Sequence, residues 1–555
     1  MMKRKLSIAI LFAVTAAFAA EKNYLNNGDF ARLDGKKNLI SWKVDAATSS
    51  VIKDGTKNVV KATSRLSYGK YSVSLRQTLR NMEEGAYTFT GEVKGEVKEL
   101  LCVFAFPKDV QKRVTFTRGR MLLPKDGWTP FQISLIVPKK SAWVGSTLTF
   151  VTPGEGNKEL QFRSFCVAKK KMPVLAIAPA APKTANNSGT AAAQPRNRQA
   201  QFMLPDAIYA VPGIESNIYY KNIFLTLNYA NYMFEVDCAV GRNDQDRWRF
   251  VPRKNEAGKK YPMTITVKDE DGVVAKGATT VYVTPADAGK GKSISLLMVG
   301  DSLTDATMFS ARVKKLFDDE KSVKLTMIGS RKDPKFPGVA HEGYGGWSWA
   351  SFLVMTPGEG VKKPSKFMVR KDGGFAFDLN AFLKKYGDGK VPDFITFQLG
   401  VNDIFGATDA NRKYKVAEVL ENADRLLAEF RKFAPDAIIG VGFTTPSATS
   451  QDAFGIHYKC GQTMWGFNQN QFLLNQAMAV HFAEKMKKDK KLFMIPTQVN
   501  LDRDHNFPMM EEAINHGNSK KIIRQCNGVH PAAAGYDQMG DSVYMWLKYQ
   551  LSKMK

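Results

Sequence analysis

The C-terminal half of the chain alternates short apolar runs with segments of helical periodicity. The apolar runs, bounded by polar and turn residues, span 294–299, 325–328, 394–399, 438–443 and 492–495. Short runs of this kind are typical of parallel strands that are covered on both faces. Between two of them, apolar residues from Val416 to Phe430 follow one helical face, and a last helix is expected over 536–551. Strands that alternate with helices predict a three-layer α/β/α domain over residues 289–555.

The N-terminal half instead alternates short runs of β-favouring residues with turn residues. Strands expected at 87–93 and 146–151 predict a β-sandwich domain over residues 21–167. A second β region, 202–288, contains an alternating strand at 261–269 followed by an Asp-Gly turn, and is expected to be an immunoglobulin-like sandwich. The segment 168–201 between them is rich in Pro, Ala, Asn and Ser, which predicts a flexible linker.

The first twenty residues have the pattern of a secretory signal peptide. Lys3, Arg4 and Lys5 precede an apolar run from Leu6 to Ala17, and Ala17-Phe18-Ala19 forms a small-x-small cleavage site. This pattern predicts a signal peptide over residues 1–20 and a secreted or periplasmic protein. No other stretch reaches the roughly 20 apolar residues of a membrane span, so no transmembrane segment is expected.

Charge adds one expectation about partners. The 555 residues include 80 Lys and Arg against 53 Asp and Glu, a formal net charge of +27. A strongly basic chain favours acidic partners. Because the chain carries an export signal and no nucleic-acid-binding motif, polysaccharide, with acidic polysaccharide as one candidate, is favoured over nucleic acid. A lysine-rich surface that only aids solubility is the alternative.

Cysteine and histidine residues do not have the spacing of metal ligands, so no metal site is predicted. Cys102 with Cys166 and Cys460 with Cys526 are candidate disulfides, although buried free thiols are an equal alternative. Most histidines are scattered: His341, His457, His481, His505 and His516.

Four short polar motifs lie at or near the ends of predicted strands, or just before the last helix. They are Gly300-Asp301-Ser302, Gly343 to Ser348, Gly400-Val401-Asn402-Asp403 and Val529-His530-Pro531. Since the carboxyl ends of parallel strands meet at one edge of a sheet, ligands bind there. Each motif alone is a common turn or cap; together they predict a site.

In the order Ser, Gly, Asn, His, these motifs resemble the four blocks of the SGNH (GDSL-type) hydrolase family, over residues 292–555. The resemblance implies a flavodoxin-like sheet, no cofactor, and ester hydrolysis through an acyl-serine intermediate. It assigns Ser302 as nucleophile and His530 as general base. Ser302, Gly346 (with Gly345 as second choice) and Asn402 would form the oxyanion hole.

One position departs from the family pattern. The family has aspartate three residues before the histidine, and this chain has Asn527. Asn527 is therefore expected to contribute to the catalytic site with lower efficiency than aspartate. Four alternatives are open. The Asn527 carbonyl oxygen orients His530 through Nδ1–H, or the Asn527 NH₂ group faces the ring, in which case Nε2 carries the proton and cannot act as base. Otherwise Asp502 or Asp504 orients His530, or the protein uses a Ser/His pair alone.

The opening of the first domain, Leu25 to Phe30 followed by Trp42, and the later segment 84–89 resemble jelly-roll carbohydrate-binding modules. With the export signal, this implies a carbohydrate esterase that removes acetyl groups from polysaccharide. A lipase or general acyl-ester hydrolase is the first alternative, and a non-catalytic glycan-binding or envelope protein is the second. The aromatic residues of 454–467, with Tyr458 and Trp465, line a sugar cleft or pack in the core.

Overall fold

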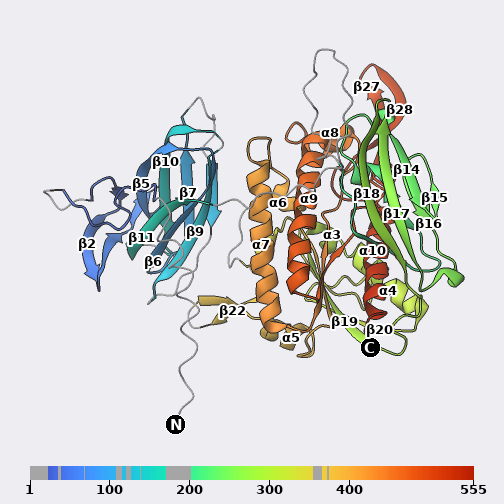
Figure 1. Cartoon of the computed structure of the whole chain (residues 1–555). Coiled ribbons are helices and arrows are strands. Elements are labelled where there is room, and N and C mark those ends of the chain that lie inside the picture. Colours follow the sequence, from blue (N-terminus) through green and yellow to red (C-terminus); the bar gives the residue numbers. More distant parts are fainter. Residues whose placement is uncertain are drawn as a thin grey trace, which may run out of the picture. The chain divides into compact units, whose positions relative to one another are not determined.

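The computed structural model describes most of the chain (Figure 1). The described residues are 23–34, 39–67, 69–107, 115–119, 127–137, 139–154, 156–170, 202–353, 365–371 and 374–554. The predicted signal peptide and residues 171–201 of the predicted linker lie outside them. Contacts divide the chain into two compact units, Met1–Pro173 with Val354–Ala376, and Val174–Leu353 with Phe377–Lys555.

The first unit is a β-sandwich of two sheets. One has the strand order β1-β5-β10-β7-β8, with β4 paired to β5, and the other has the order β2-β3-β11-β6-β9. The strands are β1 (Lys43–Asp45), β2 (Thr48–Asp54), β3 (Lys57–Thr63), β4 (Arg65–Ser67), β5 (Lys70–Met82), β6 (Gly85–Lys94), β7 (Glu99–Ala105), β8 (Thr115–Gly119), β9 (Thr129–Val137), β10 (Ser141–Val151) and β11 (Glu159–Lys169). The strands predicted at 87–93 and 146–151 are confirmed within β6 and β10. β11 ends at Lys169, two residues inside the predicted linker.

Aromatic packing closes this sandwich around Phe165. Its ring lies 5.1 Å from that of Phe30, 5.5 Å from Trp42 and 5.6 Å from Phe89. The Trp42 indole N–H also donates to the Asn27 carbonyl oxygen at 2.9 Å. The module-like opening of the domain therefore anchors the N-terminal segment to the core.

The second unit begins with a smaller pair of sheets, in the orders β12-β18-β17-β14 and β13-β16-β15. Their elements are β12 (Ala207–Ala210), β13 (Ser216–Tyr219), α2 (Tyr220–Ile223), η2 (Tyr229–Asn231), β14 (Met233–Cys238), β15 (Arg242–Asn243), β16 (Arg247–Phe250), η3 (Lys254–Glu256), β17 (Lys260–Asp269) and β18 (Gly272–Val283). The strand predicted at 261–269 and the turn after it are confirmed by the β17–β18 hairpin. The Asn222 amide donates to the carbonyl oxygens of Gln498 and Leu501, both at 2.8 Å. These sheets thus pack on a loop near the C-terminus of the same unit.

A parallel sheet forms the centre of the second unit. Its order is β20-β19-β24-β25-β26, with the short β21 also paired to β19. The strands are β19 (Ser293–Gly300), β20 (Lys324–Ile328), β21 (Glu342–Gly343), β24 (Phe394–Gln398), β25 (Ile438–Gly442) and β26 (Leu492–Ile495). All of the apolar runs predicted as strands are confirmed.

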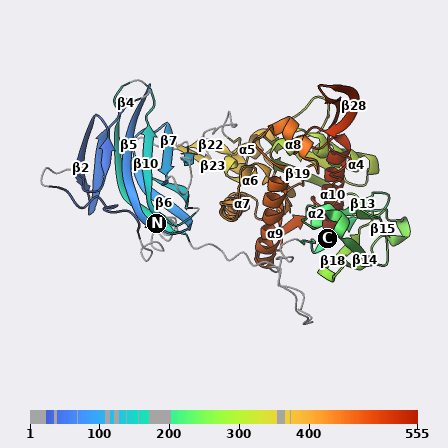
Figure 2. The same ribbon diagram turned by 90° about the horizontal axis from the view of Figure 1, so that it is seen from above.

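Helices cover both faces of this sheet (Figures 1 and 2). They are α3 (Ser302–Asp305), α4 (Met308–Glu320), η4 (Trp349–Phe352), α5 (Leu379–Tyr386), α6 (Val401–Ile404), α7 (Arg412–Phe433), α8 (Gln451–Tyr458), α9 (Met464–Lys488) and α10 (Ala533–Leu551). Phe394 of β24 contacts Trp546 of α10, with centroids 6.2 Å apart, and Phe397 contacts Phe430 of α7 at 5.0 Å. Residues three apart in a strand face opposite sides, so α7 and α10 lie on opposite faces.

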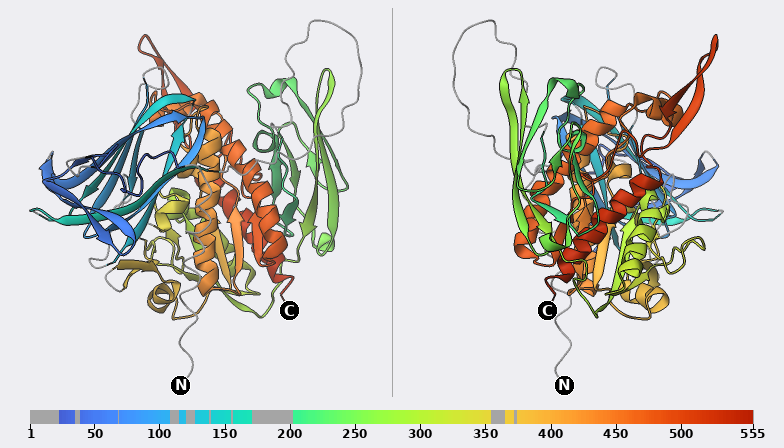
Figure 3. Two further views of the ribbon diagram at one scale, coloured as in Figure 1. Left: turned by 60° about the vertical axis from the view of Figure 1, so that its left-hand side comes forward. Right: turned by 90° about the vertical axis from the view of Figure 1, so that its right-hand side faces the viewer.

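Two short hairpins complete the described structure. One pairs β22 (Met368–Lys371) with β23 (Gly374–Phe377), and the other pairs β27 (Met509–Asn515) with β28 (Asn518–Gln525). The β27–β28 hairpin projects from the second unit just before the His530 loop (Figure 3). The sequence analysis did not predict it, because Glu511-Glu512 and Lys520-Lys521 interrupt the alternation of apolar residues.

None of the five cysteines forms a disulfide, so neither candidate pair, Cys102 with Cys166 or Cys460 with Cys526, is bonded. Among the residues that the structure describes, no helix is both long and apolar enough to cross a membrane.

Candidate active site

Ser302 lies in a tight turn between a strand and a helix. β19 ends at Gly300, and α3 begins at Ser302 with Asp301 as its N-cap, whose side chain accepts the Leu303 N–H at 3.0 Å. A Cβ atom at position 300 would collide with the Thr304 side chain and come within 2.8 Å of the Gln398 carbonyl oxygen. Glycine is therefore required before Asp301-Ser302, and the turn places Ser302 at the carboxyl end of the first strand of the sheet.

His530 lies beside Ser302 in space, although it is near the other end of the domain sequence. Its Nε2 lies 2.8 Å from Ser302 Oγ, although the two residues are 228 positions apart. Burial lowers the pKa of His530, and His457 lowers it further. The imidazole is thus neutral near neutral pH, which is the form that accepts a proton from a hydroxyl group.

Hydrogen-bond donors of the second and third motifs lie beside each other. The Asn402 side-chain amide donates to the Trp347 carbonyl oxygen at 2.8 Å, which joins the two motifs and leaves its second N–H available. Gly346, next to Trp347, has a φ of 78°, a conformation that favours glycine. In the described part of the chain, the backbone N–H groups of Ser302 and Gly346 donate no hydrogen bond. Gly345 has no such backbone conformation.

Gly400 fixes where Asn402 stands. It caps α6 with a φ of 119°, and a Cβ atom there would lie 2.5 Å from Thr444 Oγ1. Glycine therefore allows the chain to turn from β24 directly into α6, which carries Asn402 on its first turn.

Asn527 does not hold the His530 ring as the family's aspartate would. Its Oδ1 accepts the backbone N–H groups of Val529 at 3.0 Å and of His530 at 2.9 Å. Because Oδ1 accepts from two backbone donors, the orientation of the amide is fixed and the carbonyl oxygen is not directed at Nδ1. Within the described residues, Nδ1 of His530 has no hydrogen-bond partner.

A second turn in the chain shows what a carboxylate does in this geometry. Asp502 Oδ1 accepts the N–H groups of Asp504 and His505 at 2.9 and 3.0 Å, and Asp502 Oδ2 lies 3.0 Å from His505 Nδ1. The backbone pattern is that of the Asn527 turn, so Nδ2 of Asn527 corresponds to the oxygen that Asp502 directs at its histidine ring.

This Asp502-x-x-His505 sequence was missed by the sequence analysis, although its spacing is the one the family uses. The contacts of this segment also test the alternative that Asp502 or Asp504 orients His530. Asp502 binds His505, and Asp504 binds Lys221 at 2.8 Å and Thr449 Oγ1 at 2.7 Å. Neither forms a hydrogen bond with His530 among the described contacts, so the geometry is that of a Ser302–His530 pair without a carboxylate.

Two carboxyl groups adjoin the site: Asp301, which is buried, precedes Ser302, and Asp403, which is half-buried, follows Asn402. Burial raises the pKa of Asp301 to about 7 and that of Asp403 to about 7, and the Asp301 charge adds to the second shift. Asp403 accepts the Trp349 N–H at 3.2 Å and so holds the glycine motif against α6. With a pKa of about 7, each carboxyl group is partly neutral near neutral pH, which reduces the negative charge near a developing oxyanion.

The remaining candidates have other roles. His341 is buried, with Nε2 2.9 Å from Thr307 Oγ1, and burial lowers its pKa to about 4. Phe454 and Phe467 are core residues, and Tyr458 packs on Phe405 with centroids 4.8 Å apart. Across the described residues, no group of three or more His, Cys, Asp or Glu side chains is arranged to hold a metal ion.

A parallel sheet covered on both faces, with a Ser–His hydrogen bond at the carboxyl ends of its strands, defines the class of hydrolytic α/β domains. Residues 296–543 match the model of one such family, GDSL-like Lipase/Acylhydrolase. The chain thus contains a GDSL-like acylhydrolase domain, which supports an ester hydrolase.

No curated protein matches the sequence. Among solved structures, a carbohydrate-binding module in complex with β-1,4-galactotriose is 15% identical, with a TM-score of 0.21 over 27% of this chain and 99% of that chain. A xylan-binding domain from Paenibacillus barcinonensis is 10% identical, with a TM-score of 0.20 over 27% and 96%. A protein of Streptococcus pneumonia named for platelet activating factor is 19% identical, with a TM-score of 0.27 over 45% and 83%. At these TM-scores the likenesses carry no argument about function.

Proposed function

We propose that the protein is an exported serine esterase that removes O-acyl groups, chiefly acetyl groups, from a polysaccharide. The observation that carries the proposal is the 2.8 Å hydrogen bond between Ser302 Oγ and His530 Nε2 at the strand ends of a GDSL-like domain. The 2-1-3-4-5 order of the parallel strands along the sheet supports the flavodoxin-like class as well.

The residues of the site suggest a reaction in two steps. Ser302 Oγ attacks the ester carbonyl carbon as His530 takes its proton, and the oxyanion accepts hydrogen bonds from Ser302 N–H, Gly346 N–H and the Asn402 amide. His530 then returns the proton to the leaving sugar oxygen, which gives an acyl-serine and a free hydroxyl group. Water, deprotonated by His530, releases the carboxylic acid and restores Ser302.

The choice of a sugar ester rests on the sandwich domain and on the predicted export signal. A lipase is the nearest alternative, supported by exposed apolar side chains on the β27–β28 hairpin, of which Ile523 is 69% exposed. Rates on p-nitrophenyl acetate, butyrate and octanoate separate the two. We expect the acetyl ester to have the highest kcat/KM; a steady rise with chain length would favour a lipase.

The pH dependence of kcat/KM should report the lowered pKa of His530. Only the neutral imidazole accepts the Ser302 proton, so activity falls as the pH drops through the pKa of His530. Because burial and His457 lower this pKa, we expect the midpoint of the acid limb below the usual value of about 6.5. His457→Gln should move the midpoint upward. A wild-type midpoint above 6.5, or one that falls in His457→Gln, would contradict this account of the site.

Asn527→Asp should make the enzyme faster. By the geometry of the Asp502–His505 turn, the new carboxylate keeps its bonds to the two backbone N–H groups and directs its other oxygen at His530 Nδ1. The carboxylate selects the useful tautomer and stabilises the imidazolium. We expect kcat to rise at least about tenfold, or about 1.4 kcal/mol of barrier, and the acid limb to move to higher pH.

Asn518→Asp is a matched control for this change. Asn518 Oδ1 caps a turn in the β27–β28 hairpin by accepting the Lys520 N–H at 3.1 Å. The variant therefore adds the same charge, but the new carboxylate does not face His530. Peptide mass spectrometry should confirm the amide in the wild type, since Asn527-Gly528 is a sequence prone to deamidation. An unchanged kcat and acid limb in folded Asn527→Asp would show that no carboxylate is needed at this turn.

A further inference from the structure

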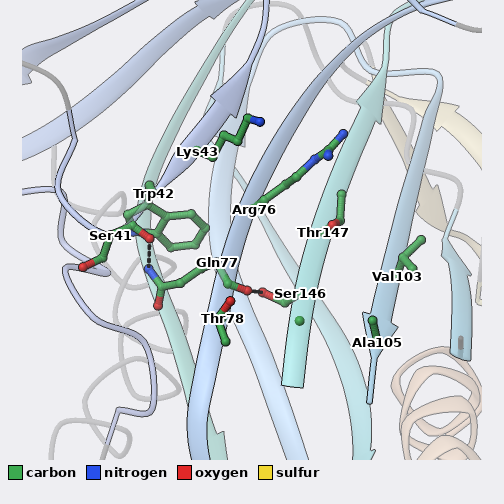
Figure 4. A pocket seen from close by; sticks show the side chains of 11 residues that line it. Ser41, Trp42, Lys43, Arg76, Gln77, Thr78, Val103, Ala105, Ser146 and Thr147 are labelled. Atoms are coloured by element: carbon green, nitrogen blue, oxygen red, sulfur yellow. Dashed lines mark hydrogen bonds between the residues drawn. The ribbon is translucent and has the colours of Figure 1, made fainter. Parts of the chain in front are cut away.

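The sandwich domain has an open groove on the outer face of one sheet (Figure 4). It has a volume of about 520 Å³, within the range of ligand-binding sites, and lies across β1, β5, β10 and β7. Figure 4 shows Lys43 and Arg76 extending beside each other from the neighbouring strands β1 and β5. All of these residues belong to the first compact unit.

The floor of the groove is made of small side chains. Thr78 of β5, Gly145 of β10 and Ala105 of β7 lie side by side in register across the sheet. A Cβ atom at Gly145 would make only ordinary contacts, at 3.4 Å from Ala105 Cβ and 3.9 Å from the Trp143 ring. Neither backbone conformation nor packing thus requires glycine at 145, and a side chain there would stand in the groove.

The rim of the groove carries an excess of positive charge. Lys43 is paired directly with Arg76 across the strands, so both side chains lie on the outer face. The carboxylate of Asp45 is shared between Arg65 and Arg76, and Lys43 forms no ion pair with any described residue. Three cations at this end therefore face one carboxylate.

A cation and an aromatic residue lie on the same face of the sheet, outside the residues that line the groove. Arg80 is exposed and stands opposite Trp143 in register, and Trp143 is 37% exposed. Arg76 and Arg80 are four residues apart on β5, which is about 13 Å along an extended strand. The cations that line the groove itself are thus Lys43 and Arg76, and Arg80 and Trp143 lie beyond its lining residues.

We propose that this groove binds an acidic polysaccharide. A guanidinium group such as that of Arg76 binds carboxylate or sulfate groups through paired charge-assisted hydrogen bonds, and Lys43 adds a second positive charge. The small floor residues let a chain lie across β5, β10 and β7, with Lys43 and Arg76 lining the same groove. The inference rests on the proposed function only in taking carbohydrate as the ligand, and it names the charge class of that ligand.

Binding can be measured without hydrolysis, in the full chain that carries Ser302→Ala. Affinity electrophoresis against polygalacturonate, dextran sulfate and unmodified dextran separates carboxylate, sulfate and neutral ligands. We expect retardation by at least one acidic polymer, none by dextran, and a loss of affinity as salt is raised. Which acidic polymer is retained identifies the anionic group.

Two groove variants and one control locate the site. Lys43→Gln with Arg76→Gln, and Gly145→Leu alone, should each weaken binding to the acidic polymer at least about tenfold. Lys53→Gln with Lys158→Gln removes two charges from exposed positions outside this sheet and should leave affinity unchanged. When Ser302 is intact, each of these variants should hydrolyse p-nitrophenyl acetate as fast as the wild type does. A failed binding test is therefore distinct from a failed esterase assignment.

Three outcomes would overturn the proposal. Equal weakening by the control pair would indicate diffuse attraction to a basic surface. Equal retention by dextran would indicate a neutral glycan site. Retention by double-stranded DNA as strong as by the acidic polysaccharide, and equally sensitive to the groove variants, would indicate a general polyanion surface.

Discussion

Ser302→Ala is expected to lower kcat for p-nitrophenyl acetate by about 10⁴- to 10⁶-fold while the protein stays folded. Alanine removes the oxygen that attacks the ester, and only the oxyanion donors remain to assist water. The substitution removes only the hydroxyl group, whose described hydrogen bond is to His530, so the melting temperature should change little. Steady-state kinetics with thermal unfolding of the same samples measures both quantities.

Ser519→Ala is the matched control for this loss. Ser519 is exposed in the turn region of the β27–β28 hairpin, and replacing it should change kcat less than about twofold. Turnover by a well-folded Ser302→Ala protein within about tenfold of the wild type would mean that another nucleophile is used.

Asn402→Ala is expected to lower kcat by about 10²- to 10³-fold with a small change in KM. The free N–H of the Asn402 amide would donate most strongly when negative charge develops on the substrate oxygen. Its loss therefore raises the activation barrier more than it weakens substrate binding. Its other N–H holds the Trp347 carbonyl oxygen at 2.8 Å, so alanine also loosens the loop of Gly346.

Asn402→Asp tests the same assignment with a side chain of equal size. It keeps the size of the side chain, removes both donors and adds a negative charge, so kcat should fall at least as far as in Asn402→Ala. A variant in which KM rises tenfold or more while kcat stays within about threefold of the wild type would assign Asn402 to substrate binding instead.

The sequence predicted the parallel sheet and the four motifs because both depend on local patterns. Apolar runs such as 394–399 are buried on both faces, and Gly300 and Gly400 permit the turns that follow their strands. The meeting of Ser302 with His530 followed from a known order of motifs and from the rule that parallel strands end at one edge.

Other features depend on contacts that the sequence does not encode locally. Asn222 binds carbonyl oxygens about 280 positions away, and nothing near Asn222 indicates that partner. The same holds for the groove of the sandwich, where Lys43, Arg76 and Gly145 come together only through strand register. The sequence indicated that Asn527 departs from its family, and the structure adds which of its atoms is engaged.

The most direct test of the account is covalent labelling with a serine-directed phosphonate, followed by peptide mass spectrometry. The reagent forms a stable bond to an activated serine oxygen, so it reads the nucleophile without regard to the natural substrate. We predict one adduct per chain, on the peptide that contains Ser302, with activity lost in proportion and no adduct in Ser302→Ala or at pH values where His530 is protonated. An adduct on another residue, or full hydrolytic activity in a protein that takes up no label, would contradict the assignment of Ser302 as the nucleophile.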